Sequence, residues 1–220
     1  MPTLSEAESK RLLGAFGVPV VDERLVATPD AAIAAADDLG YPVVAKLCGP
    51  AIAHKTERGL VRLGLTDPDQ TRRAATELLA AARPEDGDVA VLIARQLRGR
   101  RELIAGLARD PTFGTTVMVG VGGILAEAIG DIAIRLAPIA PVDAEDMIAD
   151  LATQALLGPF RGEPEVDRAR LVDVLVGLSN AADAHPEIVA ADLNPLVVVE
   201  GTPVAVDALV EVEVEVEVEG

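Results

Sequence analysis

Aromatic residues are scarce in this 220-residue chain. It contains no tryptophan, and aromatic residues make up only 2% of it, although hydrophobic residues of all kinds make up 50%. Its core must therefore be built mainly by alanine, valine and leucine, and aliphatic packing of this kind suits an α/β architecture. A chain of this length can bury a substantial core and form one or two domains.

Basic residues are also few. The chain has 19 lysines and arginines against 36 aspartates and glutamates, which gives a formal net charge of −17. Such a charge disfavours nucleic acid and anionic membrane surfaces, so we expect neither as a partner. A polyanionic ligand would need a local cluster of lysine and arginine, or a metal ion.

Cysteine and long apolar runs are nearly absent. The single cysteine, Cys48, excludes an intramolecular disulfide and is typical of a reducing compartment, and we expect its thiol to be packed and inert. Residues 1–6 lack the basic start and apolar run of a signal peptide, and no apolar stretch approaches the ~18 residues of a membrane span. These features predict a soluble, cytoplasmic protein.

Capping residues, prolines and apolar runs predict alternating helices and strands. Helix starts are expected at Ser5, Thr28 and Asp67, because side-chain oxygens of these residues can cap a helix N-terminus. The predicted helices cover residues 6–16, 29–39, 68–82, 141–151 and 168–182. The predicted strands cover residues 18–21, 41–46, 60–65, 89–94, 103–107, 115–119, 124–127, 132–139, 188–199 and 204–209.

A lysine stands at the end of the strand predicted at residues 41–46. The loop that follows Lys46 carries His54, Lys55, Arg58 and Gly59 before the chain returns as the next strand. A strand-borne ammonium group and a loop with free backbone N–H groups can together hold a polyphosphate. The alternative is an ordinary hairpin whose lysine extends to the surface.

A second basic segment follows the strand predicted at residues 89–94. It contains four arginines within residues 95–101, namely Arg95, Arg98, Arg100 and Arg101. Arginine clusters of this kind can bind phosphate, but they also occur on solvated hairpin turns. We favour the turn for Arg98 and Arg100.

Three oxygen-bearing side chains gather near the C-terminus. Asp192 and Asn194 lie two residues apart on a predicted strand and so face the same side, and Asp207 lies on the predicted returning strand. Carboxylate and amide oxygens that converge in this way suit Mg²⁺ bound together with phosphates. Alternatively, Asn194-Pro195 forms a turn or bulge and Asp207 caps a strand.

The last residues, 210–220, alternate valine with glutamate. Like charges on one face of a strand repel each other, so we expect a solvated or frayed extension, with residual helix or a partner-binding strand as the alternatives.

Several segments, taken in order, resemble a known family. They are Pro42-Val43-Val44-Ala45-Lys46, His54-Lys55-Thr56-Glu57-Arg58-Gly59, Asp110-Pro111-Thr112-Phe113-Gly114, Gly122-Gly123-Ile124, Arg135-Leu136-Ala137-Pro138 and Asp192-Leu193-Asn194-Pro195-Leu196. The chain resembles the ATP-grasp part, of the β-subunit type, of the NDP-forming acyl-CoA synthetases, which are relatives of succinyl-CoA synthetase. The resemblance extends from Ser5 to about Leu209.

The resemblance implies an α+β fold of the ATP-grasp type, with two lobes of antiparallel or mixed sheets and flanking helices that enclose a nucleotide cleft. The implied organisation is an N-terminal helix and edge strand at 1–20, a first lobe at 21–95, a second lobe with the metal-binding hairpin at 96–210, and a mobile tail at 211–220.

The resemblance also implies a set of site residues. The phosphates of ATP or ADP would contact Lys46 and Gly59, the adenine would lie along Arg95, Gln96 and Leu97, and Glu102 would lie near the ribose. Asn194 and Asp207 match the Mg²⁺ ligands of the family, and His54 matches a histidine that can relay phosphate. One departure is Leu60, which stands where the family has a second glycine.

The implied reaction interconverts acyl-CoA, ADP and phosphate with acid, CoA and ATP, through an acyl phosphate and a phosphohistidine. Nothing in the chain resembles the CoA-binding half of the family or its main phosphohistidine segment. We therefore expect a separate α-type CoA-binding subunit as partner and little activity without it. The alternatives are a non-catalytic nucleotide-binding regulatory module and a stand-alone ATP-grasp carboxylate ligase.

Overall fold

The computed structural model describes residues 2–52, 55–123 and 129–213, and these residues form two compact units. The smaller unit contains Thr3–Glu8 and Val21–Leu97. The larger unit contains Pro2, Ser9–Val20 and the described residues from Arg98 onward. Helix α1 (Glu6–Ala15) begins in the smaller unit and continues in the larger one.

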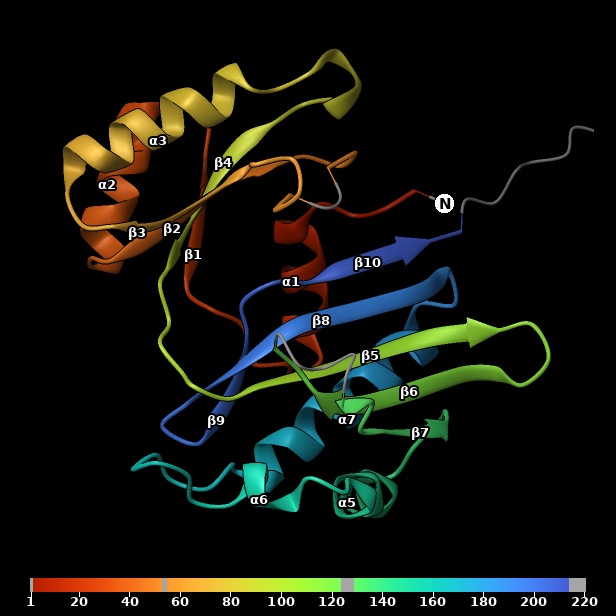
Figure 1. Ribbon diagram of the computed structural model, residues 1–220. Coiled ribbons are helices and arrows are strands. Elements are labelled where there is room, and N and C mark those ends of the chain that lie inside the picture. The colour runs from red at the N-terminus through yellow and green to blue at the C-terminus, as the bar shows by residue number, and fades with distance from the viewer. Residues whose placement is uncertain (1, 53–54, 124–128, 214–220) are drawn as a thin grey trace, which may run out of the picture. The chain divides into compact units, whose positions relative to one another are not determined.

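The smaller unit is a four-stranded antiparallel sheet with two helices (Figure 1). Its strand order is β1-β4-β2-β3. Helices α2 and α3 pack against each other and against the sheet. The elements are β1 (Glu23–Val26), α2 (Pro29–Leu39), β2 (Val43–Cys48), β3 (Val61–Leu65), α3 (Pro68–Ala80), the 3₁₀ turn η1 (Pro84–Asp86) and β4 (Ala90–Arg95).

Both helices of the smaller unit begin as their sequences predict. The side chain of Thr28 accepts a hydrogen bond from the N–H of Ala31, and that of Asp67 accepts one from the N–H of Gln70. A proline follows each cap, where its missing N–H costs nothing. Strand β2 is buried along its whole length, because the core around it consists of alanine, valine, leucine and isoleucine side chains from both helices and the sheet.

The larger unit is built on a six-stranded sheet in which all strand pairs are antiparallel. The strand order is β10-β8-β5-β6-β7, and β9 also pairs with β8. The strands are β5 (Glu102–Asp110), β6 (Gly114–Val121), β7 (Ile132–Leu136), β8 (Ile188–Val199), β9 (Thr202–Ala205) and β10 (Leu209–Val212).

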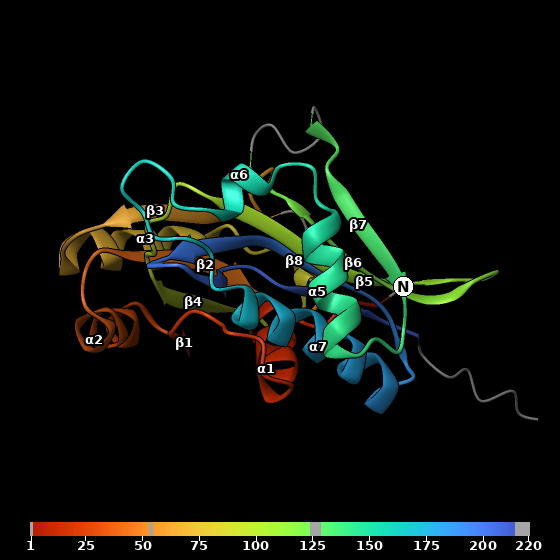
Figure 2. The same cartoon turned by 90° about the horizontal axis from the view of Figure 1, so that it is seen from below.

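Helices α5 (Pro141–Asp150) and α7 (Arg168–Ala184) pack against this sheet, and the short helix α6 (Gln154–Leu157) lies between them in sequence (Figure 2). Helix α7 contacts β5 and β6, and α5 contacts β7. Alternate residues of the strands, such as Leu107 and Val117, are fully buried. The residues between them form a row on the opposite face, in which Asp192 of β8 is followed by Gly106, Met118 and Ile134.

Three strand predictions were wrong in detail. Residues 18–21 form only a single bridge, between Val20 and Ala205, and the first strand is β1. The strand predicted at 204–209 is interrupted at 206–208 and belongs to two strands, β9 and β10. The start of the valine–glutamate repeat is also not a solvated extension, since Val210 is fully buried in β10.

The strand predicted at 124–127 lies outside the described residues, as does the repeat from 214 to 220. Among the helices that the structure describes, none combines the length and the apolar character that a bilayer crossing requires.

Candidate functional site

Lys46 lies in the middle of the buried strand β2 and is held by an ion pair. Its Nζ is 2.6 Å from Oε1 of Glu6, and Nζ of Lys55 is 2.7 Å from Oε2 of the same carboxylate. The side chains of Lys46, Lys55 and Glu6 are 9%, 8% and 0% exposed. The alternative in which Lys46 extends to the surface was therefore wrong, while its contact with nucleotide phosphates stays a prediction.

An ion pair between Arg58 and Asp86 holds the loop before β3 in place. The two terminal nitrogens of Arg58 donate to the two carboxylate oxygens of Asp86, at 2.7 and 2.9 Å. These hydrogen bonds lower the pKa of Asp86 to about 2, against the opposing effect of its burial. Gly59 follows with a φ of +67°, a conformation that favours glycine, and the side chain of Leu60 is buried in the core of the smaller unit.

The segment after β4 is tied to neighbouring strands through its backbone. The N–H of Arg95 donates to the carbonyl oxygen of Asp22, and that of Gln96 donates to the carbonyl oxygen of Pro42, both at 3.0 Å. Oε1 of Gln96 accepts a hydrogen bond of 2.7 Å from the N–H of Gly64. This segment is thus held in place, and the adenine contact proposed for it and for Leu97 stays a prediction.

Arg101 has a structural role that the sequence did not reveal. Its guanidinium donates to the carbonyl oxygens of Leu156, Gly158 and Pro164 and pairs with Glu163 at 3.3 Å. Its side chain is 3% exposed, so it anchors the 156–164 loop from within. Arg98 and Arg100 are exposed, as expected for a solvated turn.

Glu102 begins β5 and lines a cavity of about 480 Å³ in the larger unit. Gly122 and Gly123 line the same cavity. A Cβ on Gly122 would lie 3.0 Å from the backbone of Leu103, and one on Gly123 would lie 3.4 Å from Oε2 of Glu102. Because these two positions are glycines, no side chain from them fills the cavity next to Glu102. This is compatible with the predicted contact between Glu102 and a ribose.

The oxygen cluster near the C-terminus is shaped by a β-bulge in β8. Leu193 pairs with Ala105 and Leu196 with Leu103, so that Asn194 and Pro195 together oppose a single residue of β5. Bulges commonly re-aim a side chain next to a functional site. A bulge at Asn194-Pro195 was the predicted alternative to a ligand site. The structure has this bulge, and the candidate ligand Asn194 lies in it.

Asp207 completes this cluster from the break between β9 and β10, and not from a strand as predicted. Partial desolvation and the nearby charge of Asp207 raise the pKa of Asp192, and a hydrogen bond from the side chain of Asn194 acts in the opposite direction. These effects require the three side chains to be neighbours. Their oxygens suit Mg²⁺, since this ion takes few protein ligands and usually shares them with phosphates.

Within residues 2–52, 55–123 and 129–213, no three histidine, cysteine or acidic side chains are grouped so as to hold a metal ion, and Mg²⁺ binding by Asn194 and Asp207 stays a prediction. The candidate phosphate relay His54 lies outside these residues. His185, the other histidine of the chain, follows α7 and contacts Phe16 and Glu187.

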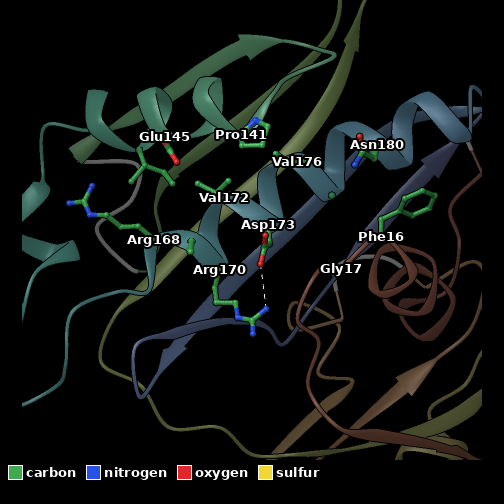
Figure 3. Close-up of a pocket in the computed structure, with 13 residues that line it drawn as sticks. Phe16, Gly17, Pro141, Glu145, Arg168, Arg170, Val172, Asp173, Val176 and Asn180 are labelled. Carbon is green, nitrogen blue, oxygen red and sulfur yellow. Dashed lines mark hydrogen bonds and ion pairs between the residues drawn. The ribbon is translucent and has the colours of Figure 1, made fainter.

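A separate cavity of about 720 Å³ lies between α5, α7 and the end of α1. Figure 3 shows Phe16, Val172 and Val176 on its walls and the ion pair between Arg170 and Asp173. It contains none of the predicted site residues.

Glu6 and Asp86 were not predicted as site residues, although Glu6 pairs with Lys46 and Lys55 and Asp86 pairs with Arg58. Glu6 is an ordinary acidic residue in a first helical turn, and Asp86 lies in a polar turn, so neither carried a local signal.

A model of the ATP-grasp domain matches residues 2–212 of the chain. The β subunit of ADP-forming acetate–CoA ligase I from Pyrococcus furiosus is 36% identical over 208 residues, which are 93% of this chain and 90% of that subunit. The ADP-forming 4-hydroxybutyrate–CoA ligase from Nitrosopumilus maritimus is 36% identical over 202 residues, which are 90% of this chain and 29% of that protein. A solved structure with a similar fold is that of dinucleotide-forming acetyl-coenzyme A synthetase 1 from Ca. Korarchaeum cryptofilum, in complex with coenzyme A, Ca-AMPCP and HgCl⁺. Its TM-score is 0.88 at 32% sequence identity, and the match covers 96% of this chain and 94% of that chain.

Proposed function

This chain belongs to the ATP-grasp family, and we propose that it is the nucleotide-binding subunit of an ADP-forming acid–CoA ligase. The observation that carries this proposal is its similarity, along almost the whole of both chains, to relatives that are themselves β subunits of such ligases. In several other relatives the matching region is about a third of a longer chain, and four of these are named ADP-forming ligases, including acetate–CoA ligase I of Archaeoglobus fulgidus.

The reaction interconverts ATP, acid and CoA with ADP, phosphate and acyl-CoA. Phosphoryl transfer of this kind needs positioning and charge neutralisation more than covalent chemistry from the protein. In this chain the ammonium group of Lys46 contacts the nucleotide phosphates, and Gly59 lets the loop backbone approach them. Arg95, Gln96 and Leu97 line the adenine, and Glu102 binds the ribose.

The fit of a metal ion is supported by the two carboxylates of Asp192 and Asp207, which repel each other when no cation lies between them. Asn194 and Asp207 hold Mg²⁺ together with the nucleotide, and Asp192 adds negative charge beside them. When bound, the ion neutralises charge on the phosphates and orients them.

The partner is a separate α-type subunit that binds CoA and carries the main phosphohistidine. A solved relative has a phosphohistidine segment that points towards its nucleotide-binding site. His54 relays phosphate between that segment and the nucleotide, because a neutral imidazole is a competent nucleophile near neutral pH.

Titration calorimetry tests the proposal. The purified chain should bind ATP and ADP in the presence of Mg²⁺ and bind them at least roughly tenfold more weakly after its removal. Asn194→Ala and Asp207→Ala should remove most of this Mg²⁺ dependence, whereas Asp146→Asn, a change at an exposed carboxylate of α5, should not. Absence of nucleotide binding in the unmodified chain would contradict the proposal.

A second experiment separates a ligase subunit from a regulatory module. The chain is mixed with a CoA-binding subunit, ADP, phosphate and acetyl-CoA, and ATP formation is measured. Formation of ATP only when both proteins are present supports the proposal, and nucleotide binding without turnover would favour a regulatory module.

A further inference from the structure

Three charged side chains are buried together in the smaller unit. Glu6 lies at the start of α1, Lys46 in the middle of β2, and Lys55 in the loop before β3. Each side chain is at most 9% exposed. Charged groups that lose their water in this way are retained only where a counter-charge and hydrogen bonds replace the lost hydration.

The carboxylate of Glu6 joins the two lysines. One of its oxygens is 2.6 Å from Nζ of Lys46, and the other is 2.7 Å from Nζ of Lys55. A carboxylate has fixed dimensions, so this arrangement also fixes the separation of the two ammonium groups. The backbone of Lys46 is itself fixed, because it pairs with Val61 on one side and Leu92 on the other.

The group as a whole carries one net positive charge, from two ammonium groups and one carboxylate. Both ammonium groups are cationic N–H donors, which is the kind of group that binds phosphate oxygens. A pair of ammonium groups held at a fixed spacing is suited to neighbouring oxygens of a di- or triphosphate, because no lysine rotamers then have to be ordered when the ligand binds.

We propose that Glu6 is a positioning residue, which holds Lys46 and Lys55 together as one binding group for the phosphates of the nucleotide. This inference rests on the function proposed above. Protein kinases offer a physical parallel on an unrelated fold, since phosphoryl transfer there requires an ion pair between a strand lysine and a helix glutamate.

Positioning by Glu6 and simple electrostatic attraction predict opposite effects of Glu6→Gln on polyphosphate affinity. If only the local field mattered, Glu6→Gln would raise the net charge of the group by one and strengthen the binding of a polyphosphate. If Glu6 positions the lysines, the same change weakens binding, because both ammonium groups lose the carboxylate that orders them.

The experiment is a double-mutant cycle on the full chain, with Mg²⁺–ATP affinity measured by calorimetry for the unmodified protein, Glu6→Gln, Lys46→Met and the double variant. We expect Glu6→Gln to weaken binding roughly tenfold in the unmodified background and clearly less in Lys46→Met, where only Lys55 is left for the carboxylate to hold. A merely structural role for Glu6 would weaken binding equally in both backgrounds. Glu77→Gln is the matched control, because Glu77 pairs with Arg62 at the surface of the same unit.

Urea unfolding of each variant shows whether it is folded under the conditions of the titration. If Glu6→Gln does not fold, Glu6→Asp takes its place, since it keeps the charge but is too short to reach both lysines as Glu6 does. Unchanged or tighter ATP binding in the variant used, or an equal loss in the Lys46→Met background, would overturn the inference. Failure of the unmodified chain to bind ATP would instead contradict the proposed function.

Discussion

Arg58 and Asp86 form a bidentate ion pair that joins the loop before β3 to the turn before β4. The two hydrogen bonds are 2.7 and 2.9 Å long, and the carboxylate of Asp86 is 1% exposed. The N–H of Arg83 donates a third hydrogen bond of 2.9 Å to the same carboxylate. The loop that carries the candidate phosphate-binding residues is therefore held at its C-terminal end by a charge pair whose carboxylate is buried.

This ion pair should make stability depend on acid pH. The pKa of Asp86 is lowered from 3.8 to about 2 by folding, so its contribution is fully present above pH 3.8 and is lost as the pH falls through about 2. The shift corresponds to about 2 kcal/mol. Urea unfolding of the unmodified chain and of Asp86→Asn should therefore differ most near about pH 5 and converge towards about pH 2. A difference that stays constant over this range would rule out the assignment.

Cys48 should be protected from thiol reagents in the folded protein. It is 2% exposed, and burial raises the pKa of its thiol, so less of the reactive thiolate is present at a given pH. Its reaction with a disulfide reagent near about pH 8 should be at least roughly 100-fold slower than in urea. Equal rates with and without urea would contradict the burial of the thiol in the folded chain.

Asp192→Asn should have opposite effects on stability and on metal binding. Partial desolvation and the nearby charge of Asp207 raise the pKa of Asp192, so its ionised form is destabilised in the folded chain at neutral pH. Removing the charge should raise the free energy of unfolding in the absence of metal and weaken Mg²⁺-dependent nucleotide binding roughly tenfold. A loss of metal-free stability, measured by urea unfolding with a chelator present, would contradict this arrangement.

Arg101→Met should destabilise the larger unit by roughly 3 kcal/mol, because it removes a buried guanidinium and leaves Glu163 and three carbonyl groups without their donor. Arg98→Met is the control, since Arg98 is exposed. Urea unfolding of both variants measures the difference. A similar small loss in the two variants would show that the anchoring of the 156–164 loop contributes little.

Local features of the sequence predicted most of the helices and strands. Thr28 and Asp67 act as caps through hydrogen bonds to residues three positions further on, so each signal lies within one helical turn. The partners of Lys46, Arg58 and Arg101 lie 40, 28 and up to 63 residues away, and no local pattern indicates such pairings. For the same reason the burial of Arg101 could not be distinguished from the exposure of its neighbours Arg98 and Arg100.

The interpretation of Asn194 shows a different limit. The sequence presented a bulge and a ligand site as alternatives, yet the structure has the bulge at the residue that was a candidate ligand. A strand pairing register is set by residues on both strands, and the extra residue in β8 becomes visible only when β5 is placed beside it.

We expect strand β10 to limit association of this chain with copies of itself. It is a short strand at the end of the sheet path, and its half-buried Glu211 and the exposed Glu213 that follows it place negative charge along the rim. Short, charged outer strands discourage the edge-to-edge pairing that leads to aggregates. Deleting the chain from Leu209 onward would make β8, a longer and less charged strand, the edge of the sheet. Variants shortened in this way should therefore aggregate more readily than the full chain.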